Sequence, residues 1–172
     1  MVFSNYQKFF SLRVVMIVVV VFVLFRHAKT TVDNFNKEGS FFPSVTLVGS
    51  KKEIVKFPID DGRSWVGLFW SVHCGPCRVE MELIQKAINS GYIPSDRVYA
   101  IHIGGDSDSV GAHMTKHGFT FPFLVDPRGE LSGLLGVALT PTSFLVEKDR
   151  KILWASSGLG VTHVFRMSNH LK

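Results

Sequence analysis

Residues 65–88 read WVGLFWSVHCGPCRVEMELIQKAI, and this stretch decides the fold. Its first part, 65–71, is a short apolar run of the kind that forms a buried strand. Apolar side chains then recur at helical spacing, which predicts a helix over 76–88 that ends near Ser90-Gly91. A second buried strand, VYAIHI, is expected at 98–103. Strand, helix and strand in this order predict a βαβ unit.

Further short elements flank this unit. Two β-rich pieces, 45–48 and 54–57, are separated by a glycine, a serine and two lysines, which predicts a hairpin. After residue 103 we expect a helix over 109–117 with Ser107 or Asp108 as its cap and Gly118 after its end. The remaining expected elements are strands at 121–125, 142–146 and 152–156 and helices at 131–135 and 161–170. Alternating elements followed by an antiparallel pair predict an α/β sandwich with a mixed sheet.

Composition and charge limit the classes of function. The chain has 172 residues, 46% of them hydrophobic, and only two cysteines, which excludes a disordered tail and a small disulfide-rich domain. The formal net charge of +5 comes mostly from residues 1–31, which hold four basic and no acidic residues. The rest of the chain is nearly neutral, so it lacks the basic face that nucleic-acid binding needs.

The same N-terminal region holds twelve consecutive apolar residues, 14–25, seven of them valine. Twelve helical residues cover about 18 Å, the length of a signal-peptide core, whereas counting from Phe9 gives about 25 Å, close to a short membrane span. Large and basic residues follow the run where a signal peptidase would need small ones. We therefore expect an uncleaved single-pass anchor over 1–31 rather than a cleaved signal or a buried core helix. A linker at 32–40 and one domain at 41–172 would follow.

Both cysteines of the chain lie in one C-x-x-C motif, Cys74-Gly75-Pro76-Cys77, at the junction of strand and helix. A disulfide across so short a loop adds little stability, and a zinc site needs more ligands than the motif supplies. Redox chemistry explains the spacing better. The helix N-terminus stabilises a thiolate on Cys74, the nucleophile, and Cys77 lies on the same helical face as the resolving thiol. Pro76 is tolerated because the first helical turn needs no N–H donor there.

Two motifs together indicate a family. Residues 68–77 resemble the active site of thioredoxin, and Thr140-Pro141-Thr142 before the apolar residues 144–146 resembles its cis-proline loop. Glu80, the hairpin and the N-terminal anchor make the chain similar to membrane-tethered thiol-disulfide oxidoreductases of the TlpA/ResA type. The resemblance covers about residues 41–160.

This resemblance implies a thioredoxin-like α/β/α sandwich with a mixed central sheet and an N-terminal hairpin, preceded by the anchor. It also implies a redox-active disulfide between Cys74 and Cys77 and no bound cofactor. The expected activity is reduction of disulfides in exported proteins, as in apocytochrome c maturation. The expected location is the inner (cytoplasmic) membrane with the domain facing the periplasm or its equivalent. An integral-membrane carrier of the DsbD or CcdA kind would supply electrons.

Several residues near the motif have a structural and a functional interpretation. Pro141 is either an ordinary turn proline or the cis-proline beside the active site, where Thr140 offers its backbone to a substrate strand. Glu80 is either a solvated helix residue or a buried carboxylate that raises thiol pKa values and relays a proton. Leu68 stands where cytoplasmic thioredoxins carry a buried acid, so Glu80 would replace that acid from the helix side.

His73 stands where the thioredoxin motif usually has Trp, and it is either exposed or, when protonated, favours the thiolate of Cys74. Trp70 is either a packing residue or a substrate contact. His113 and His117 are four residues apart on a predicted helix, where they are either solvated or two ligands of a metal.

Two other functions are compatible with the sequence. A copper-binding or copper-delivery protein would use Cys74, Cys77 and a histidine as soft and imidazole ligands. An adaptor would keep the fold without redox activity.

Overall fold

The structure is a computed structural model that describes residues 14–25, 37–160 and 162–171. The chain divides into two compact units, 1–33 and 34–172. In the first, residues 14–25 form a helix whose twelve apolar side chains are all exposed. None of the helices within the described ranges combines the length and the apolar character that a membrane span requires. The rest of the expected anchor and residues 32–36 of the expected linker lie outside the described residues.

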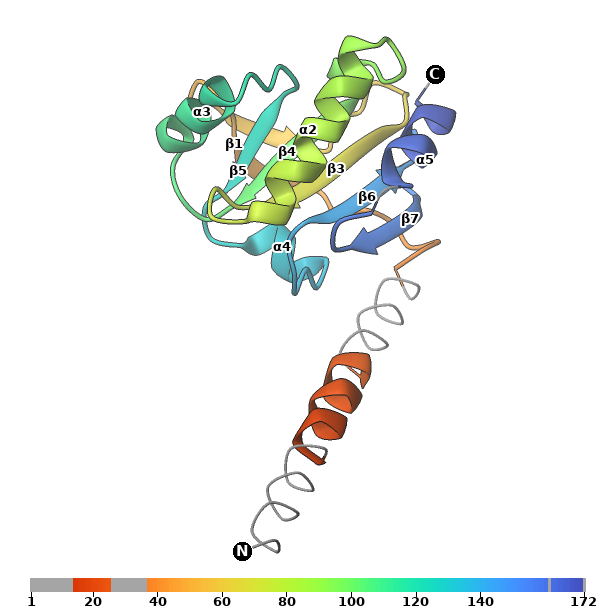
Figure 1. Cartoon of the computed structure of the whole chain (residues 1–172). Coiled ribbons are helices and arrows are strands. Elements are labelled where there is room, and N and C mark those ends of the chain that lie inside the picture. The colour runs from red at the N-terminus through yellow and green to blue at the C-terminus, as the bar shows by residue number, and fades with distance from the viewer. Residues whose placement is uncertain (1–13, 26–36, 161, 172) are drawn as a thin grey trace, which may run out of the picture. The chain divides into compact units, whose positions relative to one another are not determined.

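The second unit is built on one mixed sheet with the strand order β2-β1-β5-β4-β3-β6-β7 (Figure 1). Strands β3, β4 and β5 are parallel, whereas β6 and β1 pair antiparallel with β3 and β5. The predicted βαβ unit and mixed sheet are therefore confirmed. The strands are β1 (Val45–Val48), β2 (Ile54–Phe57), β3 (Trp65–Trp70), β4 (Val98–Ile103), β5 (Phe123–Asp126), β6 (Thr142–Val146) and β7 (Ile152–Ser157).

Helices cover both faces of this sheet. They are α2 (Gly75–Asn89), α3 (Ser107–Lys116), α4 (Glu130–Leu134) and α5 (His163–His170), with a short 3-10 turn, η1 (Ser95–Arg97). On one face, buried side chains of α2, α3 and α5 share a core with Val66, Leu68 and Ala100. On the other face, α4 packs with the aromatic residues Phe42, Phe57 and Trp65. Each face of the sheet is therefore buried, which explains why β3 is apolar throughout.

The predicted hairpin and the strands at 98–103 and 142–146 have the expected bounds. The prediction for α3 is wrong at its start, because the helix begins at Ser107 and its cap is Asp106. The Asp106 carboxylate accepts the backbone N–H of Ser109 at 2.9 Å and its hydroxyl at 2.7 Å. These hydrogen bonds hold the pKa of Asp106 below its ordinary value. Three consecutive residues can cap a helix here, so the sequence alone does not select among them.

Candidate active site

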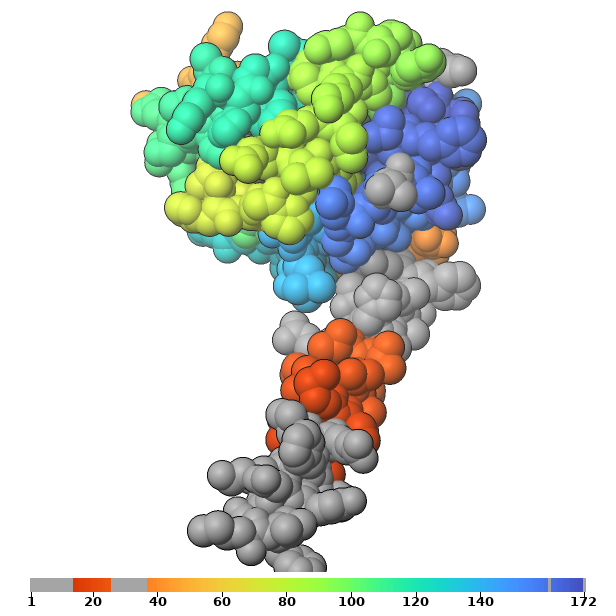
Figure 2. Space-filling model, in the orientation of Figure 1, coloured from red at the N-terminus to blue at the C-terminus, as the bar shows by residue number. Residues whose placement is uncertain are grey.

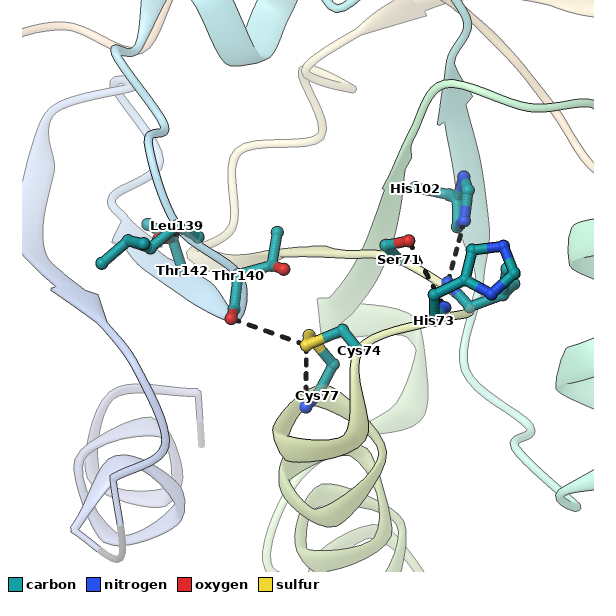
Figure 3. The surroundings of a disulfide bond; sticks show 9 residues. Ser71, His73, Cys74, Cys77, His102, Leu139, Thr140 and Thr142 are labelled. Carbon is teal, nitrogen blue, oxygen red and sulfur yellow. Dashed lines mark hydrogen bonds between the residues drawn. A yellow bond between two sulfur atoms is a disulfide. The ribbon is translucent and has the colours of Figure 1, made fainter.

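Cys74 and Cys77 form a disulfide at the N-terminus of α2 (Figure 3). Cys74 is the N-cap, with extended backbone angles, and Gly75 and Pro76 are the first two helical residues. The Cys77 backbone N–H donates to Sγ of Cys74 at 3.2 Å. Because the first-turn amides and the helix dipole favour negative charge, this position stabilises a thiolate on Cys74 when the disulfide is reduced.

The two sulfur-bearing residues differ in exposure. Cys74 is half-buried, whereas Cys77 is fully buried in the core formed by α2 and the sheet. A substrate disulfide can therefore reach Cys74 but not Cys77. This asymmetry fits the roles of nucleophile and resolving thiol.

The turn before Cys74 is fixed by a histidine that the sequence analysis did not single out. Nε2 of His102, on β4, accepts the backbone N–H of Val72 at 3.1 Å (Figure 3). Nδ1 of the same ring donates to the carbonyl oxygen of Gly104 at 2.8 Å. This arrangement requires a neutral ring, and burial lowers the pKa of His102 below its ordinary value. The residue pattern of β4 does not predict this contact, because the contact joins residues thirty positions apart in the sequence.

The two residues that flank this turn have different surroundings. His73 is exposed, and its backbone N–H donates to the Ser71 hydroxyl at 3.4 Å. Trp70 is 1% exposed and makes an edge contact with His102, with ring centroids 5.0 Å apart. Trp70 therefore packs beneath the turn and does not offer a surface to a substrate.

The loop that carries Pro141 lies against the disulfide. The Thr140–Pro141 peptide bond is cis, as the resemblance predicts. The carbonyl oxygen of Thr140 is 3.5 Å from Sγ of Cys74, within reach of the S–H of the reduced protein (Figure 3). The Thr142 hydroxyl donates to Leu139 O at 2.7 Å, and the Gly158 N–H donates to Pro141 O at 2.7 Å. These contacts fix the loop beside the exposed sulfur.

Glu80 lies on α2 three residues after Cys77 and is 1% exposed. It is therefore not the solvated helix residue of the structural interpretation. Its Oε1 accepts the hydroxyl of Ser143 at 2.9 Å and is 2.8 Å from Nδ1 of His163. Ser143 pairs with the buried Leu68 across β3 and β6, so the Glu80 carboxylate meets a side chain of β6 next to Leu68.

His163 and Ser143 do not stand out in the sequence as site residues. His163 is separated from Glu80 by 83 residues and Ser143 by 63, so no local pattern predicts either contact. The only signal for Ser143 was a small hydroxyl residue within an apolar strand. His163 falls at the start of the last helix, where an exposed side chain is the usual expectation.

The donors expected of a metal site are not gathered together. Within 14–25, 37–160 and 162–171, no three His, Cys, Asp or Glu side chains are arranged to hold a metal ion. His113 and His117 do lie side by side on α3, with ring centroids 4.4 Å apart. Burial lowers the pKa of His113. The copper alternative therefore receives no support from this geometry.

Comparison with known proteins gives one family. The sequence matches the Redoxin family over residues 37–166. Thiol-disulfide oxidoreductase ResA of Bacillus thuringiensis subsp. konkukian (strain 97-27) is 28% identical over 122 residues, which cover 71% of this chain and 69% of the relative. ResA of Bacillus subtilis (strain 168) is 22% identical over 121 residues, which cover 70% and 68%.

Solved structures confirm the thioredoxin-like fold. StoA from Bacillus subtilis superposes with a TM-score of 0.59 at 20% identity, covering 76% of this chain and 98% of StoA. The thioredoxin domain of a thiol-disulfide oxidoreductase from Bacteroides vulgatus gives 0.66 at 16% identity, covering 78% and 98%. At these identities the likeness concerns the fold alone.

Proposed function

The chain is a thioredoxin-like member of the Redoxin family, of the TlpA/ResA type, and from this premise we propose that it reduces disulfides of exported proteins through Cys74 and Cys77. It is a thiol-disulfide oxidoreductase. The observation that carries the proposal is the placement of one half-exposed and one buried cysteine at a helix N-terminus beside Thr140. The proposed substrate class is that of apocytochrome c maturation.

The reaction begins at the accessible sulfur. The Cys74 thiolate attacks one sulfur of the substrate disulfide, the other substrate sulfur leaves as a thiolate, and a mixed disulfide forms on Cys74. Cys77 then attacks Sγ of Cys74, which forms the intramolecular disulfide and releases the second substrate thiol. Two electrons pass from the enzyme to the substrate. The N–H of Cys77, 3.2 Å from Sγ of Cys74, stabilises the attacking thiolate in the first step.

The loop around Pro141 holds the substrate in this account. Thr140 is partly exposed and its carbonyl oxygen faces the reactive sulfur, so an extended substrate segment can pair with the backbone there. Exposed apolar side chains, Val79 on α2 and Leu139 and Leu159 on neighbouring loops, lie on the segments that flank the site. Such side chains suit a substrate segment that is unfolded or extended.

Glu80 is proposed to exchange a proton with Cys77. The thiol of Cys77 is buried, so water does not serve it directly, and the carboxylate is its neighbour one turn along α2. A carboxylate in this position disfavours a second negative charge on the resolving sulfur and accepts its proton as the thiol attacks.

We also propose that residues 1–31 anchor the domain at the extracytoplasmic side of the inner membrane, where a membrane carrier of the DsbD or CcdA kind re-reduces it. The support is the apolar run at 14–25, which is helical and exposed along its length. Protease treatment of spheroplasts tests this location. We expect the folded unit at 34–172 to be degraded from outside while cytoplasmic proteins survive, and its protection would contradict the proposal.

The direction of electron flow is tested by the reduction potential of the full chain, equilibrated with reduced and oxidised glutathione. A reductant should have a potential near that of thioredoxin, about −270 mV. A value near −120 mV, that of a strong oxidant, would contradict the reductase assignment. Capture of mixed disulfides by Cys77→Ser in the native host would then identify the substrates.

A further inference from the structure

The resolving thiol has no direct access to solvent. Cys77 is 0% exposed, and its neighbour Glu80 is 1% exposed. Each catalytic cycle nevertheless removes one proton from Cys77 and returns one. A carboxylate that is itself buried can take this proton but needs a further group to exchange it with water. A further group that exchanges this proton with water would extend the proposed role of Glu80 and depends on that role.

The two oxygens of Glu80 have different surroundings. Oε1 accepts the Ser143 hydroxyl at 2.9 Å and lies 2.8 Å from Nδ1 of His163. Oε2 is buried and has no hydrogen-bond partner in the described part of the chain. Cys77 carries no S–H in the disulfide form and lies one helical turn before Glu80 on α2, so we take Oε2 as the acceptor for this thiol after reduction. His163 and Ser143 therefore hold the carboxylate by one oxygen and leave the other open.

His163 joins this carboxylate to the edge of the sheet. Its ring is 4% exposed, and while Nδ1 contacts Glu80, Nε2 is 3.1 Å from the hydroxyl of Ser156 on β7. Ser156 is partly exposed. Helix α5, which carries His163, packs beside α2, and their surfaces adjoin in Figure 2. The imidazole thus spans the distance between the buried carboxylate and a hydroxyl near solvent.

The surroundings of His163 are built to hold the ring in this orientation. Trp154 contacts it edge-on, with ring centroids 4.7 Å apart. Residue 160 is glycine, and a Cβ there would overlap the imidazole. Among the residues that the structure describes, the titratable or charged groups that the contacts place around the ring are Glu80 from α2 and, beyond the indole of Trp154, the guanidinium of Arg166. The side chains from β6 and β7 that contact the network, Ser143 and Ser156, carry no charge.

We propose that His163 and Ser156 complete a proton path from Cys77 through Glu80 to solvent. When Cys77 attacks, its S–H bond breaks and an O–H bond forms at Glu80. The carboxyl group then exchanges its proton with Nδ1 of His163, whose Nε2 exchanges with the Ser156 hydroxyl and water. When the disulfide is reduced again, the Cys77 sulfur leaves with its electron pair and a proton returns along the same groups. One proton moves in each direction and the path itself transfers no electrons.

His163 is a positioning and relay residue in this account, because it acts through Glu80 and does not touch the reacting sulfur. The chain offers a matched control. Ser143→Ala and His163→Ala each remove one hydrogen bond to the same oxygen, Oε1, but only His163→Ala interrupts the path. A purely structural role would make the two variants alike.

The experiment follows reduction of the Cys74–Cys77 disulfide by dithiothreitol in the full chain in mild detergent, with free thiols trapped by a maleimide. We expect His163→Ala to slow reduction about tenfold at neutral pH, since general acid-base assistance contributes that much or more. Added imidazole should restore the rate by occupying the space that the side chain leaves. Ser143→Ala loosens the same carboxylate but keeps the path, so it should slow reduction less than His163→Ala and should not respond to imidazole. Glu80→Gln should be slow with no rescue by imidazole.

Equal slowing of His163→Ala and Ser143→Ala, without rescue by imidazole, would overturn the path while leaving the role of Glu80 intact. An unchanged rate in Glu80→Gln would instead contradict the proposed role of Glu80 and the path together. If circular dichroism shows that His163→Ala does not fold, Ser156→Ala tests the outer end of the path. A rate in Ser156→Ala that equals that of the unsubstituted chain, with no change in its solvent isotope effect, would then count against the proposal.

Discussion

Nε2 of His102 accepts the backbone N–H of Val72 at 3.1 Å, and this contact ties β4 to the turn two residues before the reactive Cys74. The other ring nitrogen is fixed by the carbonyl oxygen of Gly104 at 2.8 Å. The ring therefore spans from the end of its own strand to the active-site turn. The position of Cys74 at the helix N-terminus depends on a side chain that belongs to neither motif of the sequence.

Replacing this histidine should loosen the turn. His102→Leu leaves the Val72 N–H without its acceptor, which we expect to lower the free energy of unfolding by about 1–3 kcal/mol. His102→Gln offers an amide oxygen in place of Nε2 and should lose less. Urea unfolding of the oxidised chain measures both. An equal loss in the two variants would show that the acceptor at Nε2 does not matter.

The stability of the protein should depend on pH through the same residue. Burial lowers the pKa of folded His102 from its ordinary value of 6.5, so the unfolded chain binds a proton here at higher pH than the folded protein does. The stabilisation is complete above pH 6.5 and is lost as the pH falls toward the lowered pKa. As the pH is lowered through this range, the free energy of unfolding should decrease more steeply for the unsubstituted chain than for His102→Gln. If the free energy of unfolding depends on pH in the same way in both proteins, His102 is not the residue responsible.

The two cysteines should differ in reactivity after reduction. Cys74 is half-buried at the helix N-terminus, whereas Cys77 is fully buried. We expect iodoacetamide to alkylate Cys74 at least about tenfold faster, because both exposure and thiolate character favour it. Peptide mass spectrometry after short labelling measures the ratio. Faster labelling of Cys77 would reverse the assignment of the two roles.

Much of the second unit could be predicted from the sequence because its signals are local. The buried strand at 98–103, the hairpin and the motif at the start of α2 each follow from apolar periodicity or from turn residues within a short window. The contacts of His102 and His163 could not be predicted, since they join residues far apart in the chain. The cap of α3 was missed for a different reason, because Asp106 has two equally suitable neighbours.

The cis bond between Phe57 and Pro58 was also missed. It lies at the end of β2, and no companion motif drew attention to it, whereas Pro141 was identified through its threonine neighbours and the apolar strand that follows. A proline by itself does not reveal its isomer, and only the combination of residues around Pro141 carried the information.

An ion pair between a buried arginine and a partly exposed aspartate, away from the site, should contribute to stability. Arg97 is 3% exposed and binds Asp61 through two hydrogen bonds, at 3.1 and 2.8 Å. Asp61→Asn leaves a buried guanidinium whose one remaining charged partner among the described residues is Asp96, so we expect a loss of about 3 kcal/mol in unfolding free energy. The control is Arg63→Ala, which removes an exposed partner of the same Asp61 and should cost at most about 1 kcal/mol. Equal losses measured by urea unfolding would show that burial of Arg97 adds nothing.

The most direct measurement of the central claim is capture of a mixed disulfide on one cysteine and not on the other. The full chain carrying Cys77→Ser, reduced and then mixed with oxidised insulin, should form a covalent complex that persists on a non-reducing gel, because no second thiol resolves it. Cys74→Ser should form none, since its remaining thiol is buried. A stable complex with Cys74→Ser and none with Cys77→Ser would contradict the account.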